Sequence, residues 1–115
     1  MATSKINSGV NRKILTVESA NNFNTVYIRA VQYDSFVWIC GFFMDTGSSK
    51  SGNVAIVKNA GQIVNSGNQL SCVGEHGDKA TFINIVNSGN DIIISISEVL
   101  SSNDACRFQC IYPLV

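Results

Sequence analysis

Apolar residues in this chain fall in short runs that are separated by clusters of Gly, Ser, Asn and Asp. Runs rich in β-branched and aromatic residues between turn residues predict β-strands. Glu98–Asn103 is predicted to form a helical turn or a loop. The predicted strands are Arg12–Glu18, Asn24–Gln32, Ser35–Asp45, Asn53–Lys58, Gln62–Asn65, Gln69–Val73, Lys79–Val86, Asp91–Ser97 and Ala105–Pro113.

Many short strands with Gly-containing turns indicate an all-β fold. We expect an antiparallel β-sandwich, jelly-roll-like fold or barrel of about eight or nine short strands, with no substantial helix. A chain of 115 residues is expected to form one domain. Residues 12–115 are assigned to that β-sandwich domain, and residues 1–11 to a polar lead-in or an expression remnant.

A six-residue segment occurs twice, as Ile63–Asn68 and as Ile85–Asn90. Each copy ends one apolar run and leads into the next through Asn-Ser-Gly-Asn, which is the pattern of a β-hairpin turn. The flanking residues differ, so the pattern indicates one local turn used twice and not an internal duplication. Gly67 and Gly89 are expected to supply the positive φ of the two turns.

The predicted strand Ser35–Asp45 is apolar on both faces. One face carries Phe36, Trp38, Cys40, Phe42 and Met44, and the other carries Val37, Ile39, Gly41 and Phe43. A strand with one wet face alternates apolar and polar residues, so both faces should be covered, one by the core and the other by a second sheet or another subunit. Ile92–Ile94 repeats the pattern. The predicted oligomer interface is Val37, Ile39, Phe43 and Ile93.

Charged residues make up 14% of the chain, against about 25% in a typical soluble domain, and the net charge is zero. No basic field exists to attract nucleic acid or an anionic membrane, so neither partner is expected. No apolar run is long enough for a transmembrane helix, and Met1–Asn11 lacks the apolar core of a secretion signal. A low-charge surface suits a chain that packs against copies of itself, although some β domains are simply poor in charge.

The four cysteines are Cys40, Cys72, Cys106 and Cys110, and no pair has the spacing of a zinc knuckle or a redox motif. Cys106 and Cys110 share one face of a predicted strand but lie about 13 Å apart, which is too far for a disulfide. All four are expected to be reduced structural residues, so the chain is expected to be made in a reducing cytoplasm.

The only histidine lies between carboxylates, in Glu75-His76-Gly77-Asp78. One His without a second nitrogen ligand gives little support for a metal site or a general base, and Gly77-Asp78 is typical of a solvated hairpin tip. No nucleophile elbow or phosphate-binding loop is present. We therefore expect no enzyme activity, catalytic residue, metal or cofactor. The acids at strand ends are attributed to solubility: Asp45, Asp78, Asp91, Glu98 and Asp104.

Two features are candidates for ligand recognition. Tyr33 and Asp34 form a predicted turn, where a phenol beside a carboxylate could hold a sugar, and the alternative is an exposed turn with no ligand. Trp38 is attributed to core or interface packing. The candidate ligand-binding residues are Tyr33, Asp34, Glu75, His76 and Asp78.

The order of segments resembles the C-terminal receptor-binding head domain of phage tail fibre and baseplate proteins. The resemblance runs from Asn24 onward and rests on the strand Asn24–Ala30, the turn after it, the apolar strand Phe36–Phe42, the late hairpin Ala80–Ile94 and the final strand Arg107–Pro113. It implies a β-sandwich or jelly-roll head that forms a homotrimer, is a virion or tail-tip component, and adheres to a host-surface glycan. Such heads have no fixed binding motif, so no site residue is carried over. The four cysteines and the missing fibre stalk depart from the pattern.

Three functions stay open from the sequence. The first is a non-enzymatic homotrimeric head domain of a phage or viral fibre-type protein that binds a host-surface receptor, either a carbohydrate or a protein. The second is a structural capsid, baseplate or assembly subunit that binds only protein. The third is a free-standing lectin-like β domain. An enzyme that depends on His76 is a remote fourth.

Overall fold

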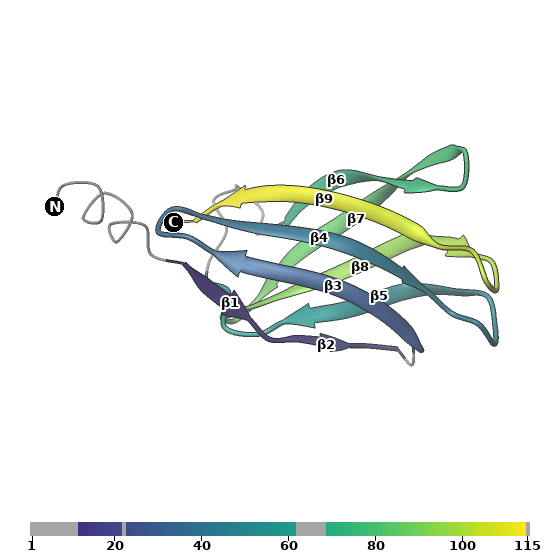
Figure 1. Cartoon of the computed structure of the whole chain (residues 1–115), viewed down its shortest axis with the longest axis horizontal. Coiled ribbons are helices and arrows are strands. Elements are labelled where there is room, and N and C mark those ends of the chain that lie inside the picture. The colour runs from purple at the N-terminus through teal and green to yellow at the C-terminus, as the bar shows by residue number, and fades with distance from the viewer. Residues whose placement is uncertain (1–11, 22, 62–68, 115) are drawn as a thin grey trace, which may run out of the picture.

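The structure, a computed structural model, describes residues 12–21, 23–61 and 69–114 (Figure 1). These residues form nine strands and no helix, which confirms the predicted all-β antiparallel fold. The strands are β1 (Lys13–Leu15), β2 (Val17–Ser19), β3 (Thr25–Gln32), β4 (Phe36–Met44), β5 (Lys50–Val57), β6 (Gln69–His76), β7 (Lys79–Ser88), β8 (Asp91–Leu100) and β9 (Cys106–Pro113).

Several strand boundaries differ from the predicted ones. The first predicted strand is divided into β1 and β2, with Thr16 between them. Strand β8 continues to Leu100, so the helical turn predicted from Glu98 is wrong, and a turn follows at Ser102–Asn103. The predicted strand Gln62–Asn65, the first repeat copy and the lead-in 1–11 lie outside the described residues.

The nine strands form one sheet in the order β1-β3-β4-β9-β6-β7-β8-β5-β2, and every neighbouring pair is antiparallel. Strands β1 and β2 lie at its two edges but are almost contiguous in the chain, so the sheet is nearly closed. Figure 1 shows two layers, with β3, β4 and β9 in front of β5, β8 and β7. The order β9-β6-β7-β8 is a Greek key, in which β9 returns to lie beside β6.

Turns of the predicted type connect the hairpins. Between β3 and β4 the amide of Tyr33 donates to the carbonyl of Phe36 over 2.8 Å, and the two rings stack. Gly89 joins β7 to β8 with a φ of 62°, as the second repeat copy predicts. The first copy lies between β5 and β6, and these two strands are not neighbours in the sheet. Only the hairpin predicted for the second copy is therefore confirmed, and the turn predicted at Gly67 lies outside the described residues.

The core fills the space between the layers. On β4 it receives Val37, Ile39 and Phe43, each 0% exposed, and β8 contributes Ile92, Ile94 and Ile96. The predicted interface is therefore wrong for Val37, Ile39 and Phe43, since residues buried inside one chain cannot contact another. Both faces of β4 are apolar, so the sequence pattern does not indicate which one is inside. Ile93 has the opposite orientation to its buried neighbours and is half-buried.

The outer face of β3, β4 and β9 carries the second apolar surface of the long strand. Phe42 is in register with Tyr27 on β3, and their ring centroids are 5.2 Å apart. Trp38 is in register with Ile111 on β9. Tyr27 is 68% exposed and Ile111 is 61% exposed. We call this surface the outer aromatic face: Tyr27, Trp38, Phe42 and Ile111.

Among the described residues there is no helix with the length and hydrophobicity that crossing a membrane would require.

Candidate ligand-binding groove

The two layers meet at a short seam between β6 and β9. Only two residue pairs join these strands in the ladder, Glu75 with Arg107 and His76 with Cys106. Gly74 permits this approach because a Cβ at its position would lie 3.1 Å from both the Arg107 carbonyl oxygen and the Cys106 sulfur. Beyond these two pairs β6 and β9 share no further ladder pairs. The two strands are therefore paired only at the end of the seam that carries the β6–β7 turn.

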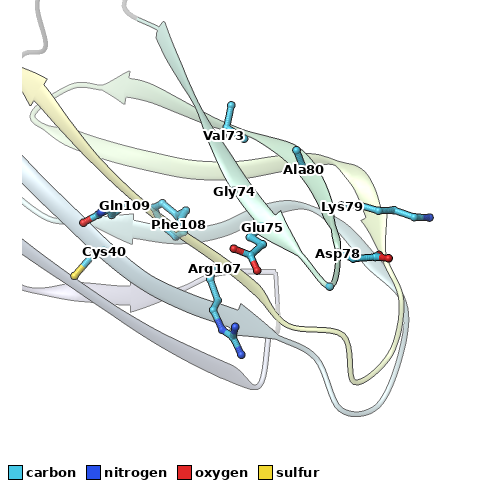
Figure 2. Close-up of a pocket in the computed structure, with 11 residues that line it drawn as sticks. Cys40, Val73, Gly74, Glu75, Asp78, Lys79, Ala80, Arg107, Phe108 and Gln109 are labelled. Carbon is cyan, nitrogen blue, oxygen red and sulfur yellow. The ribbon is translucent and has the colours of Figure 1, made fainter.

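A groove of about 680 Å³ lies along this seam (Figure 2). Its volume falls within the range of about 300–1,000 Å³ that is usual for small-molecule sites. Charged groups come from Glu75, Arg107 and the β6–β7 turn, and the amide of Gln109 adds a donor and an acceptor. Its lining residues are Cys40, Val73, Gly74, Glu75, Gly77, Asp78, Lys79, Ala80, Arg107, Phe108 and Gln109.

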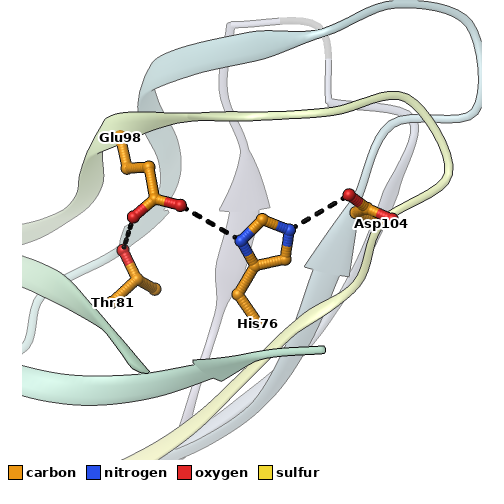
Figure 3. Close-up of polar contacts among 4 residues, drawn as sticks. All are labelled: His76, Thr81, Glu98 and Asp104. Atoms are coloured by element: carbon orange, nitrogen blue, oxygen red, sulfur yellow. Dashed lines mark hydrogen bonds and ion pairs between the residues drawn. The ribbon is translucent and has the colours of Figure 1, made fainter. Parts of the chain in front are cut away.

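Next to the groove, His76 is held between two carboxylates (Figure 3). Its Nδ1 lies 3.2 Å from Oε1 of Glu98, and its Nε2 lies 3.1 Å from Oδ2 of Asp104. Glu98 also accepts a hydrogen bond of 3.0 Å from the hydroxyl of the buried Thr81. We call Thr81, Glu98, His76 and Asp104 the His76 clamp. It joins the end of β6 to β7, β8 and the loop before β9.

The clamp favours the charged form of the imidazole. The hydrogen bond to Asp104, together with that to Glu98, raises the pKa of His76 above its ordinary value against the opposing effect of partial burial. Hydrogen bonds from Thr81 and His76 lower the pKa of Glu98. An imidazolium donates from both ring nitrogens and has no free lone pair, so in this state His76 can act neither as a general base nor as a metal ligand.

The predicted ligand-binding residues are divided between the two ends of the molecule. Glu75 and Asp78 line the groove, and His76 lies beside it with a side chain that is only 13% exposed. Tyr33 and Asp34 lie at the β3–β4 turn, at the opposite end in Figure 1, where they line a separate hollow of about 370 Å³. The structure therefore does not bring the five residues into one site.

Several groove residues were not predicted. Arg107, Phe108 and Gln109 come from β9, and they reach the groove only because β9 lies beside β6, more than thirty positions earlier in the chain. No local pattern in the sequence signals this long-range pairing.

Four of the five acids attributed to solubility have structural partners. Glu98 and Asp104 bind His76, and this also replaces the interpretation of His76 as a solvated tip. Asp45 is 4% exposed and accepts two hydrogen bonds of 2.8 Å from Ser48. Asp91 accepts from Lys58 and from the Asn59 amide, both over 2.9 Å.

Within residues 12–21, 23–61 and 69–114, no group of three or more His, Cys, Asp or Glu side chains is placed to hold a metal ion. All four cysteines are free, which agrees with the prediction of reduced residues.

No model of a known protein family matches the sequence, and no curated protein matches it. The groove, the His76 clamp and the outer aromatic face are therefore the features of the molecule that bear on its function.

Proposed function

We propose that this protein is a non-enzymatic adhesion module that binds a carbohydrate in the groove between β6 and β9. The observation that carries the proposal is the composition of the groove, in which Glu75, Arg107 and Gln109 lie beside the apolar Val73 and Ala80. Within this proposal the chain is the head domain of a phage or viral fibre-type protein, it assembles as a homotrimer, and the glycan lies on a host surface.

Saccharides fit this chemistry because they carry hydroxyl groups next to apolar C–H faces. A carboxylate accepts hydrogen bonds from hydroxyl groups, a guanidinium donates two in a fixed fork, and a carboxamide does both. The glycine backbone at Gly74 and the small side chain of Ala80 leave the groove open to an extended chain. An open groove gives weak single-site binding, and three copies in one trimer would raise the avidity at a multivalent surface.

The His76 clamp supports this proposal by fixing the end of the groove. His76 is adjacent to Glu75, and the clamp holds the end of β6 against β8 and the loop before β9. A rigid wall lowers the cost of ordering the site when a ligand binds. In this role His76 is a positioning residue and does not contact the sugar.

The test is a glycan array, followed by calorimetric titration of the best-binding glycan. Glu75→Gln keeps the shape of the side chain and removes its charge, and we expect it to weaken binding about 10-fold to 100-fold, because a hydrogen bond to a charged group contributes about 1.5–3 kcal/mol. Asp34→Asn makes the same change at the other end of the molecule and is the matched control. It should leave the affinity unchanged, and both variants should keep the wild-type denaturation midpoint within experimental error.

Two results would overturn the proposal. If no glycan on the array binds, carbohydrate recognition is excluded as the function. If Asp34→Asn abolishes binding and Glu75→Gln does not, the site lies at the β3–β4 turn, where Tyr33 and Asp34 were first predicted to bind.

A structural assembly subunit is the second candidate, and the outer aromatic face favours it. Exposed Tyr27 and Ile111 lie beside Phe42 and Trp38 on one side of the sheet, and such a surface is typical of protein contacts. With Val37, Ile39 and Phe43 inside the core, this is the apolar face of β4 that is left for self-association. Sedimentation velocity distinguishes the states: a trimer that Tyr27→Ser dissociates supports contact through this face, and a wild-type monomer at micromolar concentration refutes the trimer.

A further inference from the structure

Two of the four thiols face each other across the open part of the seam. The ladder pairs Glu75 with Arg107 and His76 with Cys106, and the same register continued along both strands places Cys72 opposite Cys110. Cys72 is in register with the buried Ile83 on β7, and Cys110 is in register with the buried Ile39 on β4, so both thiols point toward the core side of the sheet. The Cys110 thiol also contacts the Tyr112 hydroxyl.

The separation of these strands is compatible with a disulfide. Where the ladder is intact, at Glu75 and Arg107, opposite residues have Cα atoms about 4.5–5.5 Å apart, and a disulfide spans Cα separations of about 4.4–6.8 Å, so the strands can diverge slightly by Cys72 and still be bridged. Both thiols are partly buried against the same core, on the same side of the two strands. The other two thiols are placed differently, since Cys40 is on the outer face of β4 and Cys106 is fully buried.

We infer that Cys72 and Cys110 form a reversible disulfide across the β6–β9 seam when the protein meets a small-molecule disulfide such as oxidised glutathione. The bond would close the seam where its backbone ladder stops. Because Val73–Glu75 on one strand and Arg107–Gln109 on the other line the groove, the bond would also fix the distance between the groove walls.

The two thiols have different roles in this exchange. Hydrogen bonding from Cys110 lowers the pKa of Cys72, whereas the hydrogen bond to Cys72 and burial raise the pKa of Cys110. Cys72 therefore reacts first as the thiolate: its sulfur attacks one sulfur of oxidised glutathione, and one glutathione thiolate leaves and takes up a proton. Cys110 then loses its proton and attacks the Cys72 sulfur, which releases the second glutathione. Two protein thiols are oxidised, and one glutathione disulfide is reduced to two thiols.

Peptide mapping tests the inference without any mutation. Trypsin cleavage after Arg29, Lys50, Lys58, Lys79 and Arg107 places the four cysteines on four separate peptides. Protein treated with oxidised glutathione, alkylated and digested should give the peptide 59–79 linked to the peptide 108–115, and the intact chain should lose two hydrogen atoms in mass. Dithiothreitol should restore both peptides, and the oxidised form should unfold at a higher urea concentration than the reduced form.

Variants supply the matched controls. Cys40→Ser should leave the linkage intact, whereas Cys110→Ser should abolish it and leave glutathione attached to Cys72. The inference is overturned if the wild-type protein keeps four free thiols in excess oxidised glutathione, if another pair of peptides is linked, or if glutathione stays on Cys72 in the wild-type chain. Because these readouts need no ligand, failure of the carbohydrate proposal does not affect them.

Discussion

Replacing Gly41 by alanine should destabilise the fold more than a similar change at any hairpin glycine. Gly41 lies in the middle of β4, in register with Ile28 on β3 and Phe108 on β9, and its φ is +147°. A Cβ at this position would lie 2.0 Å from the carbonyl oxygen of Tyr27 and 2.8 Å from the Cα of Ile28. These are backbone atoms, so relief requires β3 and β4 to move apart.

The cost has two parts. Overpacking costs about 1–3 kcal/mol, and an unfavourable backbone conformation costs about 1–3 kcal/mol, so we expect Gly41→Ala to lower the free energy of unfolding by about 2–6 kcal/mol. This is a large part of the roughly 5–15 kcal/mol that stabilises a domain of this kind. Because Tyr27 and Phe42 flank the contact, the same movement would disturb their ring pair on the outer aromatic face.

Urea denaturation followed by tryptophan fluorescence measures this loss. Gly89→Ala is the matched control, since Gly89 also has a positive φ, 62°, but an added Cβ would have no atom within 4 Å. Only the conformational cost of about 1–2 kcal/mol then applies. If Gly41→Ala loses no more stability than Gly89→Ala, the close approach of β3 to β4 described here is refuted.

Three further predictions concern the clamp, the core and the seam. The raised pKa of His76 means that its stabilisation is complete below the ordinary value of 6.5 and is lost as the pH rises through the folded-state pKa. His76→Asn should therefore flatten the alkaline decline in the urea midpoint, and an unchanged pH profile would contradict the clamp. Ile94→Ala should lose about 2–5 kcal/mol by leaving a core cavity, whereas the outward-facing Ile93→Ala should lose much less; equal losses would contradict the assigned orientation of β8. Gly74→Ala should speed amide hydrogen exchange in β6 and β9 but not in β3, and uniform exchange rates would refute the role of this glycine in the seam.

Local patterns predicted the strands well because a strand is specified by neighbouring residues. Alternation in Asn24–Gln32 and the turn residues at Tyr33–Asp34 and Gly89 correspond to β3, β4 and the β7–β8 hairpin. The face of β4 that is buried could not be predicted in this way. Both of its faces are apolar, and the choice depends on the layer that packs against it.

The groove could be predicted only in part, because its two walls come from strands far apart in the sequence. Glu75 and Asp78 were identified from the charged residues around the β6–β7 turn, but Arg107 on the opposite wall was not. Glu98 and Asp104, the carboxylates that bind His76, were attributed to solubility because they too lie far from His76 in the sequence. Their role depends on the path of β8 and the following loop at the end of the sheet.

The central claim is that the groove between β6 and β9 binds the ligand, and chemical-shift mapping tests it most directly. The measurement is a titration of ¹⁵N-labelled protein with the best-binding glycan from the array, followed by amide spectra. We predict that the largest shifts fall on Val73–Ala80 and Arg107–Gln109, with Tyr33 and Asp34 unaffected. Shifts centred on Tyr33 and Asp34, or no shifts at saturating glycan, would contradict the account.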